Sequence, residues 1–459
     1  MRAFRPILRR GFSSLHQKPF TLPPPKLISS SKLVDEERVP WYGHNRFYPA
    51  KPGDVLADCF QILVKIGYGS SSTAWLARDL RQYVNSMISS PNIALNSVSD
   101  SSDGEVVVTL KITNSDGAVS EQELEIEEHI AKSGSSHGGR ALLRTNLEYF
   151  QVEGPQGKHL CLAYPPMRES LWRFQRRFEN SVVPFPLLKV YLVILLEALD
   201  CLHTACGVVH SDLKLENIMM PFEDGEVLSN FLNQHLEQPA EYKIDATGRH
   251  VYRHNSDFGD LRRLWMNMVP HIVDFGSSLQ LHGETGRGLY PIQSNQYRAP
   301  EVTLGFPWNR SADIWNLGTL IWDMAEGTEL FQQAQDPTGN YNAKAHLAEM
   351  IALLGPPPPN LISASHSTLV LKWPQKIQLY GGELCENAME MFHGPFFDDD
   401  GNFLHQQLIP DRKIEDTLPL LEKKDRYELL SFARKMLTWD PEERPTAREL
   451  LEHSFLKLQ

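Results

Sequence analysis

The amino-acid sequence predicts an α+β protein with two lobes, a small β-rich lobe that carries one main helix and a larger, mainly helical lobe. Residues 62–66 and 105–112 are rich in β-branched side chains and predict strands early in the chain. Residues 187–203 repeat apolar side chains at helical spacing and predict a long buried helix further on. Strands in one part of a chain and helices in another are typical of the α+β class.

Composition places the chain among ordinary globular proteins. Hydrophobic residues make up 41% and charged residues 22% of the 459 positions, which excludes collagen-like, fully disordered and coiled-coil chains. The net charge of −12 argues against a protein that mainly binds nucleic acid and suits a basic partner, although a solvated acidic face is the commoner explanation. The five cysteines have no C-x-x-C spacing and predict reduced thiols. The longest apolar run, residues 190–196, is far shorter than a membrane span, so we expect no membrane association.

The first 47 residues predict a basic extension and linker. No acid precedes Asp35, whereas arginines and lysines are frequent there. An Arg-rich, acid-poor start that contains serine is typical of a mitochondrial transit peptide, and a disordered basic tail explains it equally well. The Pro-rich residues 22–27 are typical of a linker.

A glycine pair follows the first predicted strand, at Gly67-Tyr68-Gly69, and another strand-like segment comes next. Glycines let a hairpin backbone approach phosphates with its N–H groups free. A strand on either side favours such a phosphate loop over a dinucleotide-binding turn, which opens a helix. Most isolated glycine pairs of this kind are merely turns.

Lys111 lies inside an apolar strand, where it is either an edge lysine with its amine in water or a point charge for nucleotide phosphates. The second role needs a carboxylate partner, and residues 121–130 predict a helix that carries several. We choose Glu123, because two isoleucines then share its face at helical spacing. Glu127 is the alternative, and the remaining acids predict a solvated face.

The strongest chemical signal is the stretch His210-Ser211-Asp212-Leu213-Lys214-Leu215-Glu216-Asn217. It supplies a carboxylate that can accept a hydroxyl proton, a cation for a transferring phosphoryl group and an amide oxygen for Mg²⁺. Four polar residues at this spacing, just after an apolar helix, seldom arise by chance.

Two D-F-G tripeptides compete for the role of metal ligand. Asp257 follows a polar loop and predicts turn chemistry, whereas Asp274 follows a short apolar strand that can hold it rigidly. Only 25 residues separate Asp274 from the later Ala299-Pro300-Glu301, against 42 for Asp257. We therefore choose Asp274.

From Tyr48 to Leu456 the chain resembles a eukaryotic protein kinase. Within that superfamily it is most similar to the SR-protein-specific kinases, the SRPK branch of the CMGC group, in a compact form. The motifs that carry this resemblance are residues 48–54 (YPAKPGD), 67–79 (GYGSSSTAWLARD), 210–212 (HSD), 292–298 (IQSNQYR) and 346–356 (HLAEMIALLGP).

The resemblance implies a kinase domain over residues 54–456. The small lobe would cover residues 54–164 and the large lobe residues 167–456, with inserts at 80–104 and 219–270. ATP and Mg²⁺ would bind between the lobes.

The resemblance also implies roles for single residues. Asp212 would be the catalytic base and Lys214 the contact to the γ-phosphate, while Asn217 and Asp274 would bind Mg²⁺. Lys111 and Glu123 would form the lysine–glutamate pair. The nucleotide would be held by Ile66, Gly67, Gly69 and Met167, with Tyr164 as gatekeeper before it.

Three further residues have structural roles by the same resemblance. Glu301 and Arg444 would form a buried ion pair, in which leaving either charge alone would cost about 3–5 kcal/mol. Asp313 would cap the backbone of the catalytic stretch.

Ser211 stands where most kinases of this type have an arginine that meets an activation-loop phosphate, which orders the loop. We therefore predict that activity does not need phosphorylation of Ser277, Ser278, Thr285 or Tyr290.

The function that the resemblance implies is ATP- and Mg²⁺-dependent transfer of a phosphoryl group to serine or threonine hydroxyls of proteins. Arg/Ser-rich proteins linked to mRNA splicing are the expected substrates. The alternatives are a mitochondrial or dual-specificity kinase of the same fold, or a pseudokinase that serves as a scaffold. A monomer of the cytoplasm and nucleus, without nucleic acid or membrane contacts, is expected, and the N-terminal composition leaves the mitochondrion as the alternative location.

Overall fold

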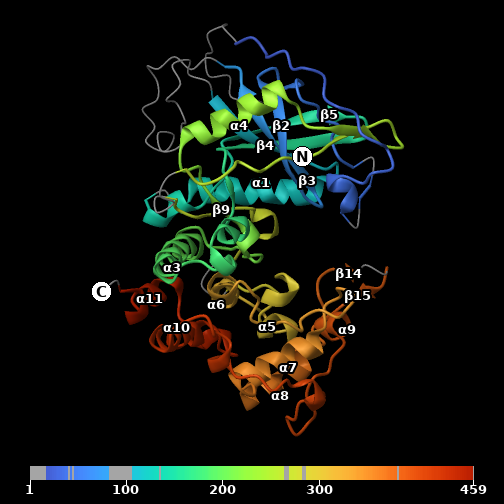
Figure 1. The fold of residues 1–459 in the computed structure, drawn as a ribbon. Coiled ribbons are helices and arrows are strands. Elements are labelled where there is room, and N and C mark those ends of the chain that lie inside the picture. Colours follow the sequence, from blue (N-terminus) through green and yellow to red (C-terminus); the bar gives the residue numbers. More distant parts are fainter. Residues whose placement is uncertain are drawn as a thin grey trace. The chain divides into compact units, whose positions relative to one another are not determined.

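The computed structural model divides into two compact units (Figure 1). Unit 1 comprises residues up to 127, 144–169 and 220–268, and unit 2 comprises 128–143, 170–219 and 269–459. The residues that the structure describes are 17–39, 42–43, 46–81, 106–133, 136–262, 268–281, 286–379 and 382–457. The basic start and most of the 80–104 insert lie outside them, so the predictions made there stay predictions.

Unit 1 is built on a six-stranded antiparallel sheet of order β1-β2-β3-β4-β6-β5. The helix α1 (Gly117–Lys132) follows β4, and its first part belongs to this unit. Alternating side chains place Phe60, Ile62, Trp75 and Leu110 in one core cluster. The strands are β1 (Val55–Leu56), β2 (Phe60–Tyr68), β3 (Ser72–Asp79), β4 (Val106–Thr113), β5 (Glu148–Gly154) and β6 (Gly157–Tyr164).

The insert expected in the large lobe packs instead against this sheet. Helix α4 (Gly225–Glu237) begins at Asp224, whose side chain caps the amide of Glu226, and its apolar side chains repeat at helical spacing. They join Leu63, Val64 and Leu76 of the sheet in a second core cluster. Helix α4 runs beside β2 of the sheet (Figure 1). The hairpin of β10 (Tyr242–Ile244) and β11 (His250–Tyr252) follows. This placement corrects the lobe boundary, because a buried amphipathic helix needs an apolar surface and the sheet offers one.

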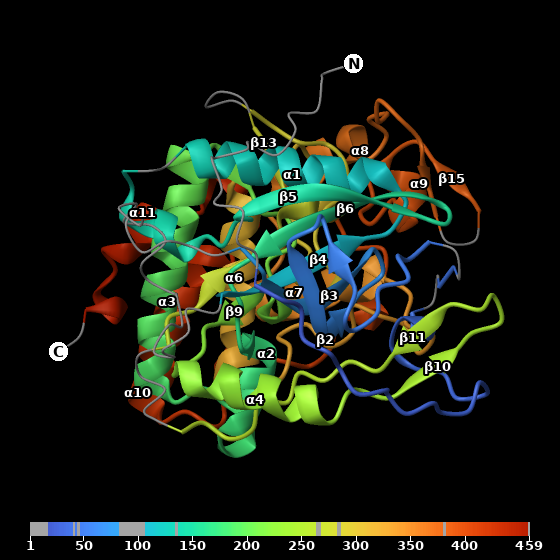
Figure 2. The ribbon, with the colours of Figure 1, turned by 90° about the horizontal axis from the view of Figure 1, so that it is seen from above.

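Residues 17–39, which fall within the predicted basic extension and linker of the first 47 residues, are also part of unit 1. The backbone of Phe20 exchanges two hydrogen bonds with the Gln61 side chain, at 2.8 and 2.7 Å, and its ring lies under the Arg78 guanidinium at 4.0 Å. The amide of Ile28 donates to the Tyr242 carbonyl at 2.8 Å, so the segment runs beside the β10–β11 hairpin (Figure 2). Its partners lie far away in the sequence, which is why its composition alone suggested a linker.

Unit 2 is mainly helical. Helix α6 (Ser311–Glu326) is buried from Ala312 to Ala325 and forms its centre. Helix α3 (Phe185–Asp200) continues through a π-helical turn, and residues 179–205 are long and apolar enough by composition to cross a membrane. Five leucines of α3 are fully buried among other helices, which accounts for that composition. The other helices are α2 (Leu171–Phe174), α5 (Pro300–Thr303), α7 (Ala343–Leu354), α8 (Pro359–Thr368), α9 (Ala388–Phe392), α10 (Lys423–Met436) and α11 (Ala447–Leu451).

The strands of unit 2 are short and support the loops between the helices. The predicted division into a β-rich part and a helical part is confirmed. The strands that lie wholly or partly in this unit are β7 (Glu169–Ser170), β8 (Val208–Val209), β9 (Ile218–Met220), β12 (His271–Ile272), β13 (Leu279–Gln280), β14 (Ile377–Gln378) and β15 (Leu384–Cys385).

Candidate active site

Asp313 holds the start of the catalytic stretch, as predicted. The amides of His210 and Ser211 donate to its two carboxylate oxygens at 2.8 and 2.9 Å, and His203 Nε2 lies 2.9 Å from one of them. The side chain is fully buried. Burial acts to raise the pKa of Asp313, but the hydrogen bonds and the two histidines lower it below its usual range. An ionised carboxylate therefore fixes the turn that carries Asp212.

The structure brings Asp212, Lys214 and Asn217 together. Lys214 Nζ lies 2.6 Å from Asp212 Oδ2, and Asn217 Nδ2 donates to the carbonyl of Asp212 at 2.9 Å. The hydroxyl of Ser294 donates to the other carboxylate oxygen at 2.8 Å. Sequence reasoning missed Ser294, because it lies 82 residues further on in a motif valued only for its resemblance. Donors on both oxygens thus fix the orientation of the Asp212 carboxylate.

Asp274 lies beside Asn217 because short strands anchor both. Strands β12 and β9 pair antiparallel, the Val273 amide donates to the Asn217 carbonyl at 3.0 Å, and His210 Nε2 lies 3.0 Å from the Val273 carbonyl. Asp274 itself is exposed, with left-handed φ of 64°. Such a conformation costs a non-glycine residue about 1–3 kcal/mol and is concentrated at functional sites.

The other D-F-G has the turn chemistry that was predicted for it. Asp257 Oδ1 accepts the amide of Gly259 at 3.0 Å, and the Asp257 amide donates to Asn255 at 2.9 Å. Phe258 packs against Phe231 of α4, with ring centroids 4.3 Å apart. Asp257 lies in unit 1, whereas Asp212 and Asp274 lie in unit 2.

In unit 1 the structure pairs Lys111 with Glu123, Nζ to Oε1 at 2.5 Å. The alternative, Glu127, is fully buried one turn later and accepts the Tyr164 hydroxyl at 2.9 Å and the Asn146 amide at 2.7 Å. Burial, and then the charge of Glu123, raise the pKa of Glu127 to about 7, against the lowering effect of its hydrogen bonds and of Lys111.

The titration of Glu127 makes stability depend on pH in a defined direction. Because its folded-state pKa of about 7 exceeds the ordinary value of 4.5, the folded protein binds more protons, and this contribution to stability falls as pH rises from about 4.5 to about 7. We expect Glu127→Gln to remove it, so that the variant gains on the order of 2–3 kcal/mol relative to wild type between pH 5 and pH 8. Denaturant unfolding at several pH values measures this. Glu128→Gln, at an exposed neighbour, is the control, and a pH-independent difference for Glu127→Gln would contradict the assignment.

The glycine loop has room for a ligand. The Gly69 amide donates to the Ser72 carbonyl at 2.9 Å, and a Cβ added at Gly69 would meet nothing within 4 Å. The described chain itself therefore gives no steric reason for glycine there. Thr109 lies two residues before Lys111 and so shares its face of the sheet, and its buried hydroxyl has no hydrogen-bond partner among the described residues. The open space at Gly69 and the unpartnered Thr109 hydroxyl on the face of Lys111 fit a nucleotide.

Two other residues predicted to contact the nucleotide differ in exposure. Ile66 is half-buried before the loop, whereas the Met167 side chain is 4% exposed. The Arg144 guanidinium donates to the Pro165 carbonyl at 2.6 Å, which fixes the chain just before Met167.

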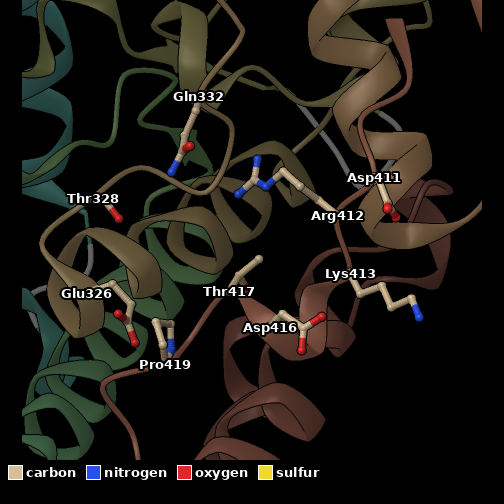
Figure 3. A pocket seen from close by; sticks show the side chains of 9 residues that line it. All are labelled: Glu326, Thr328, Gln332, Asp411, Arg412, Lys413, Asp416, Thr417 and Pro419. Atoms are coloured by element: carbon tan, nitrogen blue, oxygen red, sulfur yellow. The ribbon is translucent and has the colours of Figure 1, made fainter. Parts of the chain in front are cut away.

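A cavity of about 490 Å³ lies next to Asp212. Lys214 and Ser294, which both contact the Asp212 side chain, line the cavity. The other lining residues are Glu216, Asn295, Gln296 and Gln335. A second cavity in unit 2, of about 530 Å³, is lined by Glu326, Asp411, Arg412 and neighbouring residues (Figure 3). None of the predicted site residues lines the second cavity.

Glu301 and Arg444 form the expected pair. Both guanidinium nitrogens lie 2.7 Å from the carboxylate, and the two residues are 1% and 5% exposed. The bidentate geometry makes this a structural contact.

Ser211 links the catalytic stretch directly to the segment that follows Asp274. Its hydroxyl donates to the Ser277 carbonyl at 2.6 Å, and the buried Ser278 hydroxyl donates to the His210 carbonyl at 3.1 Å. The segment after Asp274 is therefore tied to the catalytic stretch without a phosphate. Tyr290 is engaged as well, because its hydroxyl accepts the Gln375 amide at 2.8 Å.

We expect alanine at Ser277, Ser278 and Tyr290, and at Thr285, which lies outside the described residues, to leave kcat within about threefold of wild type. Ser278→Ala loses one buried hydrogen bond, about 1 kcal/mol of stability. Steady-state kinetics of phosphatase-treated protein provides the measurement. Loss of turnover in a variant that still unfolds cooperatively would refute the prediction.

Comparisons with known proteins agree with this geometry. A model of the protein kinase domain matches residues 263–456. A serine/threonine protein kinase of Aspergillus fumigatus is 33% identical over 434 residues, 94% of this chain and 93% of that protein. The serine/threonine-protein kinase SRPK of Physarum polycephalum is 26% identical and covers 92% of this chain and 91% of its own length. Protein kinase dsk1 of Schizosaccharomyces pombe is 23% identical, with 72% and 73% covered.

A solved structure shows the same fold. The crystal structure of a kinase domain matches with a TM-score of 0.60 at 18% identity, over 90% of this chain and 99% of that one. The predicted fold class is confirmed by this match.

Proposed function

This chain belongs to the serine/threonine protein kinases, and from that premise we propose that it transfers the γ-phosphoryl group of ATP to serine in arginine-rich protein segments. Asp212 would accept the proton of the substrate hydroxyl. Ser294 and Asn217 fix the orientation of its carboxylate, and Lys214 lies close enough to stabilise charge on the transferring group.

The residues for the nucleotide and a divalent metal fit that chemistry. Lys111, held by Glu123, would contact the α- and β-phosphates, and Asn217 with Asp274 offer the amide and carboxylate oxygens that Mg²⁺ prefers. When bound, the metal neutralises charge on the phosphate oxygens.

The preference for arginine is supported by a cluster of carboxylates next to the Asp212 cavity. Asp323 is 7% exposed, and its Oδ2 has no hydrogen-bond partner among the described residues. Burial, and then the charges of Glu329 and Glu216, raise its pKa well above the usual range. Glu216 itself lines the cavity. A buried carboxylate with an unused oxygen and two acidic neighbours is stabilised by a cation.

A guanidinium suits this cluster better than an ammonium. It presents several N–H donors in a planar fork and can bind more than one carboxylate at once, whereas an ammonium is a compact, strongly hydrated charge. The name of the similar Physarum kinase, SRPK, is that of the family to which the sequence motifs point. The single observation that carries the proposal is the unpaired oxygen of Asp323, a buried carboxyl that interacts electrostatically with the cavity-lining Glu216.

The test compares peptides of Arg-Ser repeats, Lys-Ser repeats, acidic sequences and Pro-directed sequences at two salt concentrations. We expect the Arg-Ser peptide to have the highest kcat/KM, with a KM that rises with salt. Asp323→Asn should raise its KM about tenfold, the equivalent of one charged contact of about 1.4 kcal/mol, and leave kcat nearly unchanged. Glu452→Gln makes the same change in net charge at an exposed position and should have no effect. Equal rates for Arg-Ser and Pro-directed peptides would overturn the proposal.

A further inference from the structure

Three consecutive acids near the N-terminus form a clamp on the strand that leads into the glycine loop. We define the clamp as Asp35, Glu36 and Glu37 with their partners Lys65, Lys243, Arg249 and His254, all in unit 1. The acids lie in one short 3₁₀ turn. Asp35 and Glu36 share Lys65 of β2, and each of the three acids also pairs with one base of residues 243–254. Segments from three distant parts of the sequence therefore meet in one cluster of charges.

Lys65 is the centre of the clamp. Its side chain is 1% exposed, and Nζ contacts Glu36, Asp35 at 3.2 Å and the Tyr252 carbonyl at 3.0 Å. It lies in β2 at a register shift against β3, two residues before Gly67. A buried lysine is costly without counter-charges, so this position is tied to the N-terminal acids.

The other acids tie the insert into the same cluster. Arg249 lies 2.6 Å from Glu36, and Lys243 lies 2.8 Å from Glu37. The Asn255 amide donates to the Lys65 carbonyl at 2.8 Å. Strand β1 pairs only with the first two residues of β2, so Lys65 lies beyond the part of β2 that β1 covers. The three carboxylates face three permanent cations, which makes the buried cluster close to neutral.

His254 carries the clamp to the loop itself. Its amide donates to Asp35 Oδ2 at 2.5 Å, and its ring packs edge-on against Tyr68, with centroids 5.1 Å apart. Tyr68 is the residue between the two glycines. Asp35 holds a left-handed φ of 46°, a conformation that persists only where the surroundings enforce it.

We propose that the clamp pre-orders the glycine loop and so sets the affinity for ATP, with Glu36, Lys65 and His254 as positioning residues. The proposal rests on the proposed function in that it takes ATP as the phosphoryl donor. A loop that is already ordered loses less conformational entropy when it closes over phosphates, so ATP binds more tightly. The clamp touches no residue proposed for the phosphoryl step.

The first experiment measures KM for ATP, KM for the peptide and kcat in Glu36→Gln and His254→Ala. We expect KM for ATP to rise about fivefold in both, with kcat and the peptide KM within about twofold of wild type. Lys26→Ala breaks an exposed ion pair with Glu241 in the same N-terminal segment and should change none of them. An unchanged KM for ATP in either folded variant would overturn the proposal.

The second experiment needs no turnover and separates this inference from the proposed function. Hydrogen exchange of the amides at residues 67–72 should be about fivefold faster in Glu36→Gln than in wild type, without nucleotide. If Glu36→Gln unfolds, His254→Ala takes its place in this experiment, because it leaves the three acids and their lysine and arginine partners unchanged, and loop exchange should again be faster than in wild type. Wild-type exchange rates in these variants would refute the clamp even if ATP proved to be the donor. Fast exchange in a protein that failed to use ATP would refute only the function.

Discussion

Asp212→Ala is expected to lower kcat about a thousandfold while the protein keeps its fold. General base catalysis contributes about 10²–10⁴ to a rate, and Asp212 is the carboxylate that Ser294, Lys214 and Asn217 orient. Its side chain is half-buried, and the backbone of this stretch is held by Asp313, so the turn survives the substitution. Initial rates at saturating ATP and peptide, with a thermal unfolding curve for each variant, provide the measurement.

The two D-F-G tripeptides provide a matched pair of aspartate substitutions, one at the proposed metal ligand and one at a turn. Asp274→Asn should lose metal-dependent turnover, whereas Asp257→Asn changes the same motif at a turn and should keep kcat near wild type. Near-normal phosphorylation by Asp212→Ala, or equal losses at the two tripeptides, would contradict the assigned roles.

Lys111→Met is the second substitution with a large expected effect. It removes the cation for the α- and β-phosphates, and we expect kcat/KM for ATP to fall at least a hundredfold. The change also leaves Glu123, which is 3% exposed, without its 2.5 Å partner and next to the buried Glu127, at a cost of about 1–3 kcal/mol.

Two further variants separate the catalytic effect from the loss of stability. Glu123→Gln keeps the lysine but removes the charge of its ion-pair partner, so it should lower kcat/KM for ATP by a smaller factor. Lys132→Met removes an exposed lysine of α1 and should change neither quantity. ATP kinetics and denaturant unfolding, measured on the same variants, distinguish the loss of catalysis from the loss of stability. A wild-type kcat/KM for ATP in Lys111→Met would show that this lysine takes no part in the mechanism.

The parts of the site that the sequence predicts well are those whose partners are close along the chain. Asp212, Lys214 and Asn217 fall within eight residues, so their spacing alone indicates that they converge. The choice of Asp274 over Asp257 depended on the apolar strand before it, which is also local. The helix carrying Glu123 offered two candidates, and only the coordinates show which acid reaches Lys111.

The parts that sequence reasoning missed depend on contacts across long separations. Asp35–Glu37 pair with bases more than 200 residues away, so nothing near them indicates that they are buried. The pKa of Asp323 is raised first by burial, then by the charge of Glu329 and then by that of Glu216, which lies more than 100 residues earlier. The sequence of its own helix indicates only that the helix is buried. Residues 225–237 carried an apolar helical pattern, but no local rule says which surface such a helix will cover.

The buried Lys65 bears on how recombinant fragments of this enzyme are designed. A fragment that starts at residue 54, the predicted start of the kinase domain, would lack Asp35 and Glu36, the two carboxylates that neutralise this ammonium group. An ammonium stranded in a dry interior destabilises a protein by about 3–5 kcal/mol, enough to make a domain of ordinary stability prone to aggregate during expression. Expression vectors should therefore begin upstream of Phe20.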